Sequence, residues 1–334
     1  MELYLFRHET FRSLYNCSYF SDEEWWTIRK PNLWYGVFLI VIGTVYSVCI
    51  LLLDVVTYRA NKFEHAGYKL IFYSVSSYLG KVFISNCFTG YLSITGSAPC
   101  PNIDTLFLIR QLEEFFWACQ SCSVIIMILG RYAEIWKPRY LAEAFEGRNT
   151  YFVILATVLY AVIYAFFVKA PFYNSNIWSA NPYQGIKGFE LIDAAPYKSY
   201  FFIFHNVTNA MIIIPMYTFL VISLWLKGKS AGGAISNAQT RIILLTSLLS
   251  LSTSTYSLIY AYMSVFQLSE TGAQIVFLVR QITMGSQSVI HLTLNKGMRT
   301  GVLELFKTQR STRITHFTAS NARKDATNCS KEIV

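Results

Sequence analysis

The sequence predicts an all-α membrane protein, a seven-transmembrane helix bundle with a short amphipathic helix after the seventh span. Of its 334 residues, 54% are hydrophobic and 14% are charged, whereas a typical soluble domain has about 25% charged residues. A soluble fold of this size would lack the charge to cover its surface. Lipid offers no partner for an unpaired backbone amide, and the apolar runs are too long for barrel strands, so we expect helices.

Seven apolar runs are long enough to cross a bilayer core of about 30 Å. We expect them to form one domain, residues 34–294, after an outer N-terminal segment, residues 1–33. The expected spans are Trp34–Thr57, Tyr68–Ile94, Asp104–Arg131, Thr150–Ala170, Ser199–Leu226, Arg241–Phe266 and Ala273–Leu294.

The distribution of basic residues predicts the orientation. The side that carries the C-terminus has 18 Lys and Arg residues, and the side that carries the N-terminus has 6. Because basic loops stay in the cytoplasm, we expect a plasma-membrane protein with its N-terminus outside. The net charge of +9 then reflects topology and contact with the inner leaflet, and we expect no nucleic-acid partner. Charges scattered through the first 30 positions predict no cleaved signal peptide.

A polar pattern lies at the expected cytoplasmic end of the third run. Gly130-Arg131-Tyr132 is followed by Ile135 and Pro138, and this pattern resembles the rhodopsin-like G-protein-coupled receptors. The resemblance implies that Arg131 is held inside the resting bundle and contacts a heterotrimeric G protein on activation. Gly130 replaces the acidic residue that holds the arginine in that family, so its partner would lie elsewhere. The alternative is an arginine that anchors the helix end at the membrane surface.

Segments near both ends of the chain carry a narrower resemblance. They are Tyr15-Asn16-Cys17-Ser18, Trp25, Pro31 and Gly36, then Thr89–Ile94, and finally Leu294–Arg299. From about Tyr15 to Phe306 the chain resembles the nematode serpentine receptor class T family of chemoreceptors. The resemblance implies a sensory receptor for a small environmental or pheromone-like molecule, placed in the sensory cilium and coupled to a G protein.

The cysteines outside the runs predict a disulfide. Cys17 and Cys100 are the only cysteines on the expected outer side, and two thiols that share an oxidising compartment tend to pair. A Cys17–Cys100 bond would close an 84-residue loop and contribute roughly 4 kcal/mol through the lost entropy of the unfolded chain. The alternative is two free thiols. Asn16 begins an Asn-x-Ser sequon on the same side, where glycosylation can occur.

Ionisable residues inside the spans are candidates for the ligand site, because burying charge in a membrane is costly. Glu113 and Arg280 lie at similar depths in the third and seventh spans, and the neighbouring Glu114 points about 100° away from Glu113. We expect Glu113 and Arg280 to line a ligand pocket, with Arg110 and Gln281 at its rim. The alternative is a buried structural ion pair that contacts no ligand.

Two further ionisable residues within the spans, and the segment after the last span, give weaker indications of structure. Asp54 is placed to pair with Lys81 or with an arginine at a helix end, and the sequence leaves both open. Residues 295–307 have apolar side chains at helical spacing opposite basic ones, which predicts an amphipathic helix on the inner membrane surface. Residues 308–334 are polar and basic, and we expect a disordered cytoplasmic tail.

These features bear on three classes of function. A G-protein-coupled chemoreceptor explains the seven spans, the Arg131 pattern and the polar residues at pocket depth. A transporter or ligand-gated channel, the alternative, would need a continuous polar path. An enzyme is not expected, because the chain offers few residues for an active site. It has only five His and lacks the common hydrolase and metalloprotease motifs. We likewise expect no cofactor and no metal site.

Overall fold

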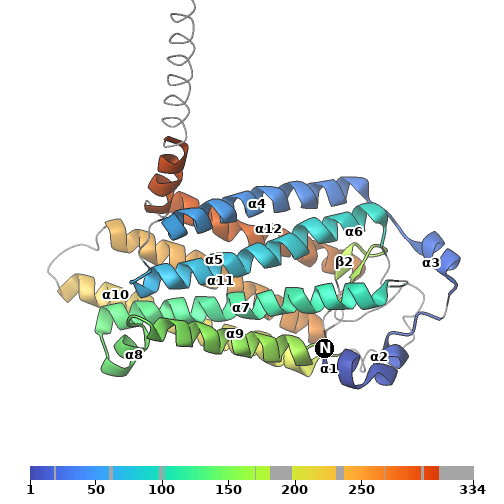
Figure 1. Ribbon diagram of the computed structural model, residues 1–334, viewed down its shortest axis with the longest axis horizontal. Coiled ribbons are helices and arrows are strands. Elements are labelled where there is room, and N and C mark those ends of the chain that lie inside the picture. Colours follow the sequence, from blue (N-terminus) through green and yellow to red (C-terminus); the bar gives the residue numbers. More distant parts are fainter. Residues whose placement is uncertain are drawn as a thin grey trace, which may run out of the picture.

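The computed structural model is an elongated bundle whose long helices run roughly along one axis (Figure 1). It describes residues 1–18, 20–59, 63–97, 100, 102–169, 171–180, 198–230, 237–266, 268–294 and 297–307. The helices are α1 (Glu2–Phe6), α2 (His8–Leu14), α3 (Asp22–Ile28), α4 (Leu33–Arg59), α5 (Ala66–Val82), the π-helix η1 (Phe83–Phe88), α6 (Thr89–Thr95), α7 (Ile103–Trp136), α8 (Arg139–Ala144), α9 (Asn149–Phe167), α10 (Tyr200–Ser230), α11 (Asn237–Val265) and α12 (Glu270–Leu294). Strands β1 (Tyr173–Asn174) and β2 (Ser179–Ala180) pair as an antiparallel hairpin.

The seven expected spans correspond to α4, the continuous α5–η1–α6, α7, α9, α10, α11 and α12. By length and composition, four of the described helices can cross a membrane: α4, α7, α9, and α10 as far as Leu226. The second crossing is divided by η1, and α11 and α12 bury hydroxyl and amide side chains such as Ser257 and Gln287. Composition therefore marks these three crossings less strongly than the other four.

Helix α7 is the central element of the bundle. Its most apolar stretch is 67% buried, compared with 28% in α4 and α10 and 22% in α9. Helices on the outside of a membrane bundle turn one face to lipid, whereas a central helix is covered on all sides. The functional residues of α7 are therefore positioned by several neighbouring helices at once.

Most helix bounds differ from the expected ones by a few residues, and the second, third and fourth crossings show the most informative differences. The third crossing does not end at Arg131 but continues to Trp136, where Lys137 adopts a left-handed conformation with φ of 49° and ends the helix. The fourth ends at Phe167 rather than Ala170. The second, expected as one regular helix, contains the six-residue π-helix η1, and such segments are frequent at functional sites.

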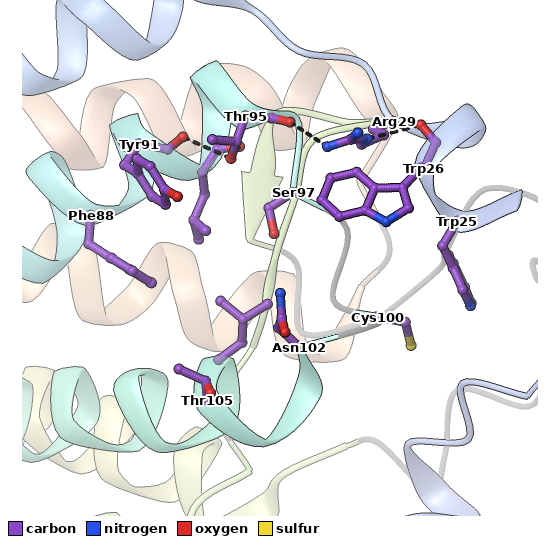
Figure 2. A pocket seen from close by; sticks show the side chains of 12 residues that line it. Trp25, Trp26, Arg29, Phe88, Tyr91, Thr95, Ser97, Cys100, Asn102 and Thr105 are labelled. Atoms are coloured by element: carbon purple, nitrogen blue, oxygen red, sulfur yellow. Dashed lines mark hydrogen bonds between the residues drawn. The ribbon is translucent and has the colours of Figure 1, made fainter. Parts of the chain in front are cut away.

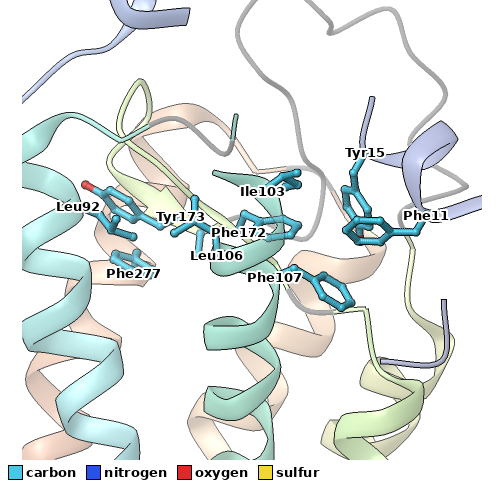
Figure 3. Close-up of a cluster of buried hydrophobic side chains, with 10 residues drawn as sticks. Phe11, Tyr15, Leu92, Ile103, Leu106, Phe107, Phe172, Tyr173 and Phe277 are labelled. Atoms are coloured by element: carbon cyan, nitrogen blue, oxygen red, sulfur yellow. The ribbon is translucent and has the colours of Figure 1, made fainter. Parts of the chain in front are cut away.

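The N-terminal segment is helical and lies over one end of the bundle. Helices α1 and α2 and the β1–β2 hairpin form a lid there, and the cluster beneath it joins the lid to α6, α7 and α12 (Figure 3). We call this the lid end of the bundle, and the opposite one the α8 end. The buried members of the cluster are Phe11, Tyr15, Leu92, Ile103, Leu106, Phe107, Phe172, Tyr173, Ala180 and Phe277.

Helix α3 is a separate short helix beside the lid, and its start is specified locally. The Ser21 hydroxyl accepts a hydrogen bond from the Glu24 backbone N–H, while the Glu24 carboxylate accepts one from the Ser21 backbone N–H. This reciprocal capping box satisfies two donors at the helix start. The same backbone bond holds the pKa of Glu24 below its usual range.

Helices α4 and α6 touch backbone to backbone at two glycines. A Cβ on Gly36 would lie 2.6 Å from the Gly90 carbonyl oxygen, and a Cβ on Gly90 would lie 2.7 Å from the Gly36 carbonyl oxygen. Small residues allow this close approach between membrane helices. Because the obstructing atoms belong to the backbone, neither helix can accommodate a larger residue by moving a side chain.

The close approach predicts that Gly90→Ala destabilises the bundle. We expect a loss of about 1–3 kcal/mol, the usual cost of overpacking, seen as a lower unfolding midpoint of the detergent-solubilised monomer. Gly67→Ala is the matched control, because the nearest atom to its Cβ, a Glu134 oxygen, would be 3.9 Å away. Equal midpoints for the two variants would contradict the packing described for α4 and α6.

The segment after α12 is helical over residues 297–307 and turns away from the bundle axis (Figure 1). Met298 is buried, and its sulfur accepts a hydrogen bond from the Thr57 hydroxyl at 3.8 Å. Val302 and Leu305 pack with Met298 on a hydrophobic cluster formed by α4 and α5, whereas Phe306 is exposed. The expected start of this helix at residue 295 and the expected disordered tail, residues 308–334, lie outside the described residues.

Candidate functional site

Five ionisable side chains meet in the interior of the bundle, and we call them the ionic core. All are less than 5% exposed, and α7 contributes three of them. A low-dielectric interior strengthens attraction between opposite charges but also makes each unpaired charge costly. The members are Lys81 of α5, Arg110, Glu113 and Glu114 of α7, and Arg280 of α12.

Glu113 lies between two arginines. One carboxylate oxygen is paired with Arg110, one turn earlier on α7, and the other with Arg280 of α12. Arg280 also donates to the Tyr260 hydroxyl of α11 at 3.2 Å. Glu113 therefore links α7 to α12, and through Arg280 to α11, at one point of the interior.

Glu114 points to a different helix. Its carboxylate accepts a hydrogen bond from the Tyr164 hydroxyl of α9 at 3.1 Å. This divergence follows from the rotation of about 100° between consecutive helical residues. Beyond Tyr164, the ring nitrogens of His205 form hydrogen bonds with Ser121 and Tyr160. Such partners are expected for a buried imidazole with a structural role.

Lys81 lies against aromatic rings. Its Nζ is 3.7 Å from the centroid of the Trp117 ring and 4.8 Å from that of Tyr256, the geometry of a cation–π contact. Asp54 instead accepts a hydrogen bond from Ser76 at 3.3 Å, so the Asp54–Lys81 pair considered from the sequence is not formed. The aromatic contacts had no sequence signal, because the rings come from α7 and α11.

Arg110 and Gln281, expected at the rim of a pocket, are both buried in the bundle interior. Arg110 is 2% exposed and Gln281 is fully buried. Arg110 Nε donates to the Pro171 carbonyl at 2.8 Å, which ties the chain leading into the hairpin to the ionic core. Gln281 accepts from Ser85 at 3.0 Å, so the η1 segment faces α12 at this position.

Two cavities lie near these elements. The first, of about 500 Å³, is at the lid end between α3, α6 and the start of α7, where Trp26 and Arg29 face Tyr91 and Thr95 (Figure 2). None of the ionic core lines it. The second, of about 300 Å³, is a groove between α11 and α12, and its lining includes Tyr256, Tyr260 and Arg280.

The Arg131 region is at the α8 end. Arg131 pairs with Glu134 at 2.6 Å, one turn further along α7, so an acidic partner exists at a position three residues later. Tyr132 donates to the Met216 carbonyl of α10 at 2.8 Å. Ile135 packs in the cluster between α7 and α10, and Pro138 is the N-cap of α8.

A small cavity of about 70 Å³ lies beside Arg131. It is lined by residues of α5, α7, α11 and α12, among them Gly130, Glu134, Leu249 and His291. Gly130 packs closely on Leu70 of α5 beside this space, since a Cβ there would lie 3.1 Å from a Leu70 methyl carbon. The pattern at Arg131 therefore borders a hollow at this end of the bundle.

Cys17 and Cys100 are joined by a disulfide, with their Cα atoms 5.7 Å apart. Trp25 of α3 packs on Cys100 and donates its indole N–H to the Cys17 carbonyl at 3.0 Å. Asn16, in the sequon, is exposed, and its side chain accepts from the Ser18 N–H at 2.9 Å. The bond tethers the lid to the start of α7.

Among the described residues no group of three or more His, Cys, Asp and Glu side chains is arranged to hold a metal ion. Cys119 and Cys122, the Cys-x-x-Cys pair of α7, are free thiols. They lie within the bundle, where small apolar side chains pack well.

Together, the helix order and the covered end define a seven-helix membrane bundle of rhodopsin-like fold. The chain is similar to the crystal structure of squid rhodopsin with a TM-score of 0.61 and 14% identity, over 86% of this chain and 87% of that one. A likeness at this identity shows the fold, and it confirms the architecture predicted from the sequence.

The family follows from the sequence comparison. The family model described as "Serpentine type 7TM GPCR chemoreceptor Srt" matches residues 1–315, and the chain belongs to that family. It is also 23% identical over 308 residues to serpentine receptor class T-55 of Caenorhabditis elegans, covering 89% of this chain and 81% of that protein. The family resemblance stated from the sequence is thereby confirmed, and the chain is a multi-pass membrane protein.

Proposed function

We propose that this serpentine receptor binds a small environmental or pheromone-like molecule within the lid-end half of the bundle and activates a heterotrimeric G protein at the α8 end. In this proposal the lid end is extracellular and Asn16 is available for glycosylation. The α8 end faces the cytoplasm of a plasma membrane, which by family resemblance is that of a sensory cilium.

The observation that carries the proposal is the ionic core. Charged side chains inside a membrane protein are costly and mark functional positions by default. Glu113 and Arg280 connect α7 with α12, and Arg280 also contacts Tyr260 of α11. A ligand that alters these pairs would shift three helices relative to one another, which is how a binding event can reach the other end of a bundle.

The α8 end supports the coupling half of the proposal. The Arg131–Glu134 pair is half exposed and borders a hollow between α5, α7, α11 and α12. An exposed ion pair contributes at most about 1 kcal/mol, so a partner protein can separate it at low cost. We infer that Arg131 leaves Glu134 and binds the G protein when the helices around the hollow move apart.

The test is nucleotide exchange on a co-expressed heterotrimeric G protein, measured without additions and with a panel of small organic acids, alcohols and amines. We expect Arg131→Ala to lower stimulated exchange at least roughly tenfold, the equivalent of losing one charge-assisted hydrogen bond. Arg148→Ala is the matched control, because Arg148 is an exposed arginine at the same end of the bundle.

If the panel stimulated nucleotide exchange equally well in Arg131→Ala and Arg148→Ala, the role of Arg131 would be contradicted. The transporter or ligand-gated channel alternative has its own outcome in this experiment. A ligand-dependent current or flux without nucleotide exchange would support it and would overturn the receptor proposal.

A further inference from the structure

The groove between α11 and α12 opens on the lipid-facing side of the bundle. Leu251 of α11 and Val279 of α12 line it and are 65% and 45% exposed, although both lie in membrane-spanning helices. Such exposed apolar side chains face lipid in a bilayer. Tyr256, Tyr260 and Arg280, which also line the groove, are buried, so the groove runs from the lipid-facing surface to the ionic core.

The lid covers the other approach to the ionic core. Phe11 and Tyr15 of the lid pack against Phe107 of α7, with ring centroids 4.9 and 6.0 Å apart. An Arg12–Asp104 ion pair of 2.9 Å and the Cys17–Cys100 bond hold the lid on α7. The cavity of about 500 Å³ at this end is not lined by any member of the ionic core.

The ionic core has more positive charge than negative. Lys81, Arg110 and Arg280 outnumber Glu113 and Glu114, which leaves a formal charge of +1. Lys81 and Arg280 both lie against the Tyr256 ring, with Nζ at 4.8 Å and Cζ at 5.6 Å from its centroid. An added negative charge at this point would offset the excess.

Several of the described buried hydrogen-bond donors around the ionic core have no partner. Within the described part of the chain, five buried nitrogens here have no acceptor, and buried donors of this kind are normally satisfied. A carboxylate accepts several such bonds and charge-assisted ones are the strongest. The five are Lys81 Nζ, Arg110 Nη2, Trp117 Nε1, Arg280 Nε and Gln281 Nε2.

We propose that the ligand is a small amphipathic anion, a carboxylate on an apolar chain, which enters from the bilayer through the α11–α12 groove and binds Arg280 with its head group. The inference rests on the proposed receptor function and specifies its ligand class. The apolar body lies against Leu251, Val279 and their neighbours, and the carboxylate takes the donors left free around Arg280. A volume of about 300 Å³ is at the small end of the range for ligand sites and suits a single-chain amphiphile.

The test uses the purified full-length receptor in phosphatidylcholine nanodiscs, with decanoate as the probe and decanol and decylamine as neutral and cationic controls. We expect radiolabelled decanoate to bind at least roughly tenfold more tightly than either control. Equal binding of the three, or preference for decylamine, would overturn the proposal. Adding an anionic phospholipid to the nanodiscs is expected to leave decanoate binding unchanged, and loss of binding there would identify a lipid head group as the occupant.

The route is tested with a matched pair of variants on α12. Val279→Trp places a large side chain in the groove, whereas Val289→Trp makes the same change at another lipid-exposed valine that does not line it. We expect Val279→Trp to weaken decanoate binding at least roughly tenfold and Val289→Trp to leave it unchanged. Equal affinities would overturn the groove as the site.

The charge is tested with Lys81→Met, which removes the excess cation without stranding a carboxylate, because Lys81 contacts rings. We expect this variant to lose affinity for decanoate and keep that for decanol; unchanged decanoate binding would contradict the charge requirement. A diazirine-bearing decanoate on the wild-type protein covers the case of a variant that does not fold. Cross-links to α11 and α12 support the proposal, and cross-links confined to Trp25–Arg29 overturn it.

The two proposals fail separately. Decanoate binding that is sensitive to Val279→Trp, without nucleotide exchange, would keep the site and reject G-protein coupling. Exchange that depends on Arg131 but responds only to neutral or cationic members of the panel would keep the receptor function and reject an anionic ligand.

Discussion

Replacing Glu113 with glutamine is expected to destabilise the receptor by about 3–5 kcal/mol, the usual cost of removing one partner from a buried ion pair. Arg110 and Arg280 would then face each other without the carboxylate that both now contact. This cost is a large fraction of the total stability of an ordinary domain. Surface expression and the unfolding midpoint of the solubilised protein measure it, and we expect little folded Glu113→Gln receptor.

Glu114→Gln is the matched control, because it changes the neighbouring carboxylate on the same helix. Its amide oxygen can still accept the bond from Tyr164, so we expect a loss of only about 1 kcal/mol. A Glu113→Gln/Arg280→Gln double variant should regain part of the lost stability. Exchanging the two charges should not, because an arginine at 113 would lie beside Arg110. Normal expression of Glu113→Gln would show that the ionic core does not hold the helices together.

Cys17→Ser is the second variant with a large expected effect. The disulfide joins residues 83 positions apart, and the lost restraint on the unfolded chain corresponds to about 4 kcal/mol. The effect should be local as well, because the bond tethers the lid to α7. We expect faster backbone hydrogen exchange across α1 and α2 as Phe11 and Tyr15 leave the cluster beneath the lid, together with a lower unfolding midpoint.

Cys49→Ser is the control, since Cys49 is a free, half-buried cysteine of α4. It should leave exchange in α1 and α2 unchanged. Cys17→Ser and Cys100→Ser should behave alike, because each removes the same bond. Unchanged exchange in the lid after either substitution would mean that aromatic packing and the Arg12–Asp104 pair suffice to hold it.

The seven crossings could be predicted because membrane insertion depends on local composition. A run of about 20 apolar residues is recognisable without knowing its neighbours, and the observed helices match the expected spans within a few residues at most ends. The exceptions are places where a tertiary contact or a single residue determines the backbone conformation. The π-helix η1 places Ser85 opposite Gln281 of α12, and α7 continues to Trp136, where Lys137 ends it. Neither feature has a periodic signal in the sequence.

The site was predicted in part for the same reason. Charged residues within apolar runs are visible in the sequence, and depth along a helix follows from its rise of 1.5 Å per residue, so Glu113 and Arg280 could be matched. Rotation about the helix axes could not be predicted. It decides that Arg110 turns inward to Glu113 and that Lys81 lies on Trp117, where the sequence suggested a rim residue and a partner for Asp54.

By itself, then, the sequence determined the class of fold, the spans, the family and the residues with unusual chemistry, because each depends on composition and order along the chain. Only the tertiary structure decided which of these residues meet. The three-way contact at Glu113, the cover formed by the N-terminal segment and the groove that leads to Arg280 depend on how helices distant in sequence pack. That packing is set by side-chain shape summed over the whole bundle, which no local pattern records.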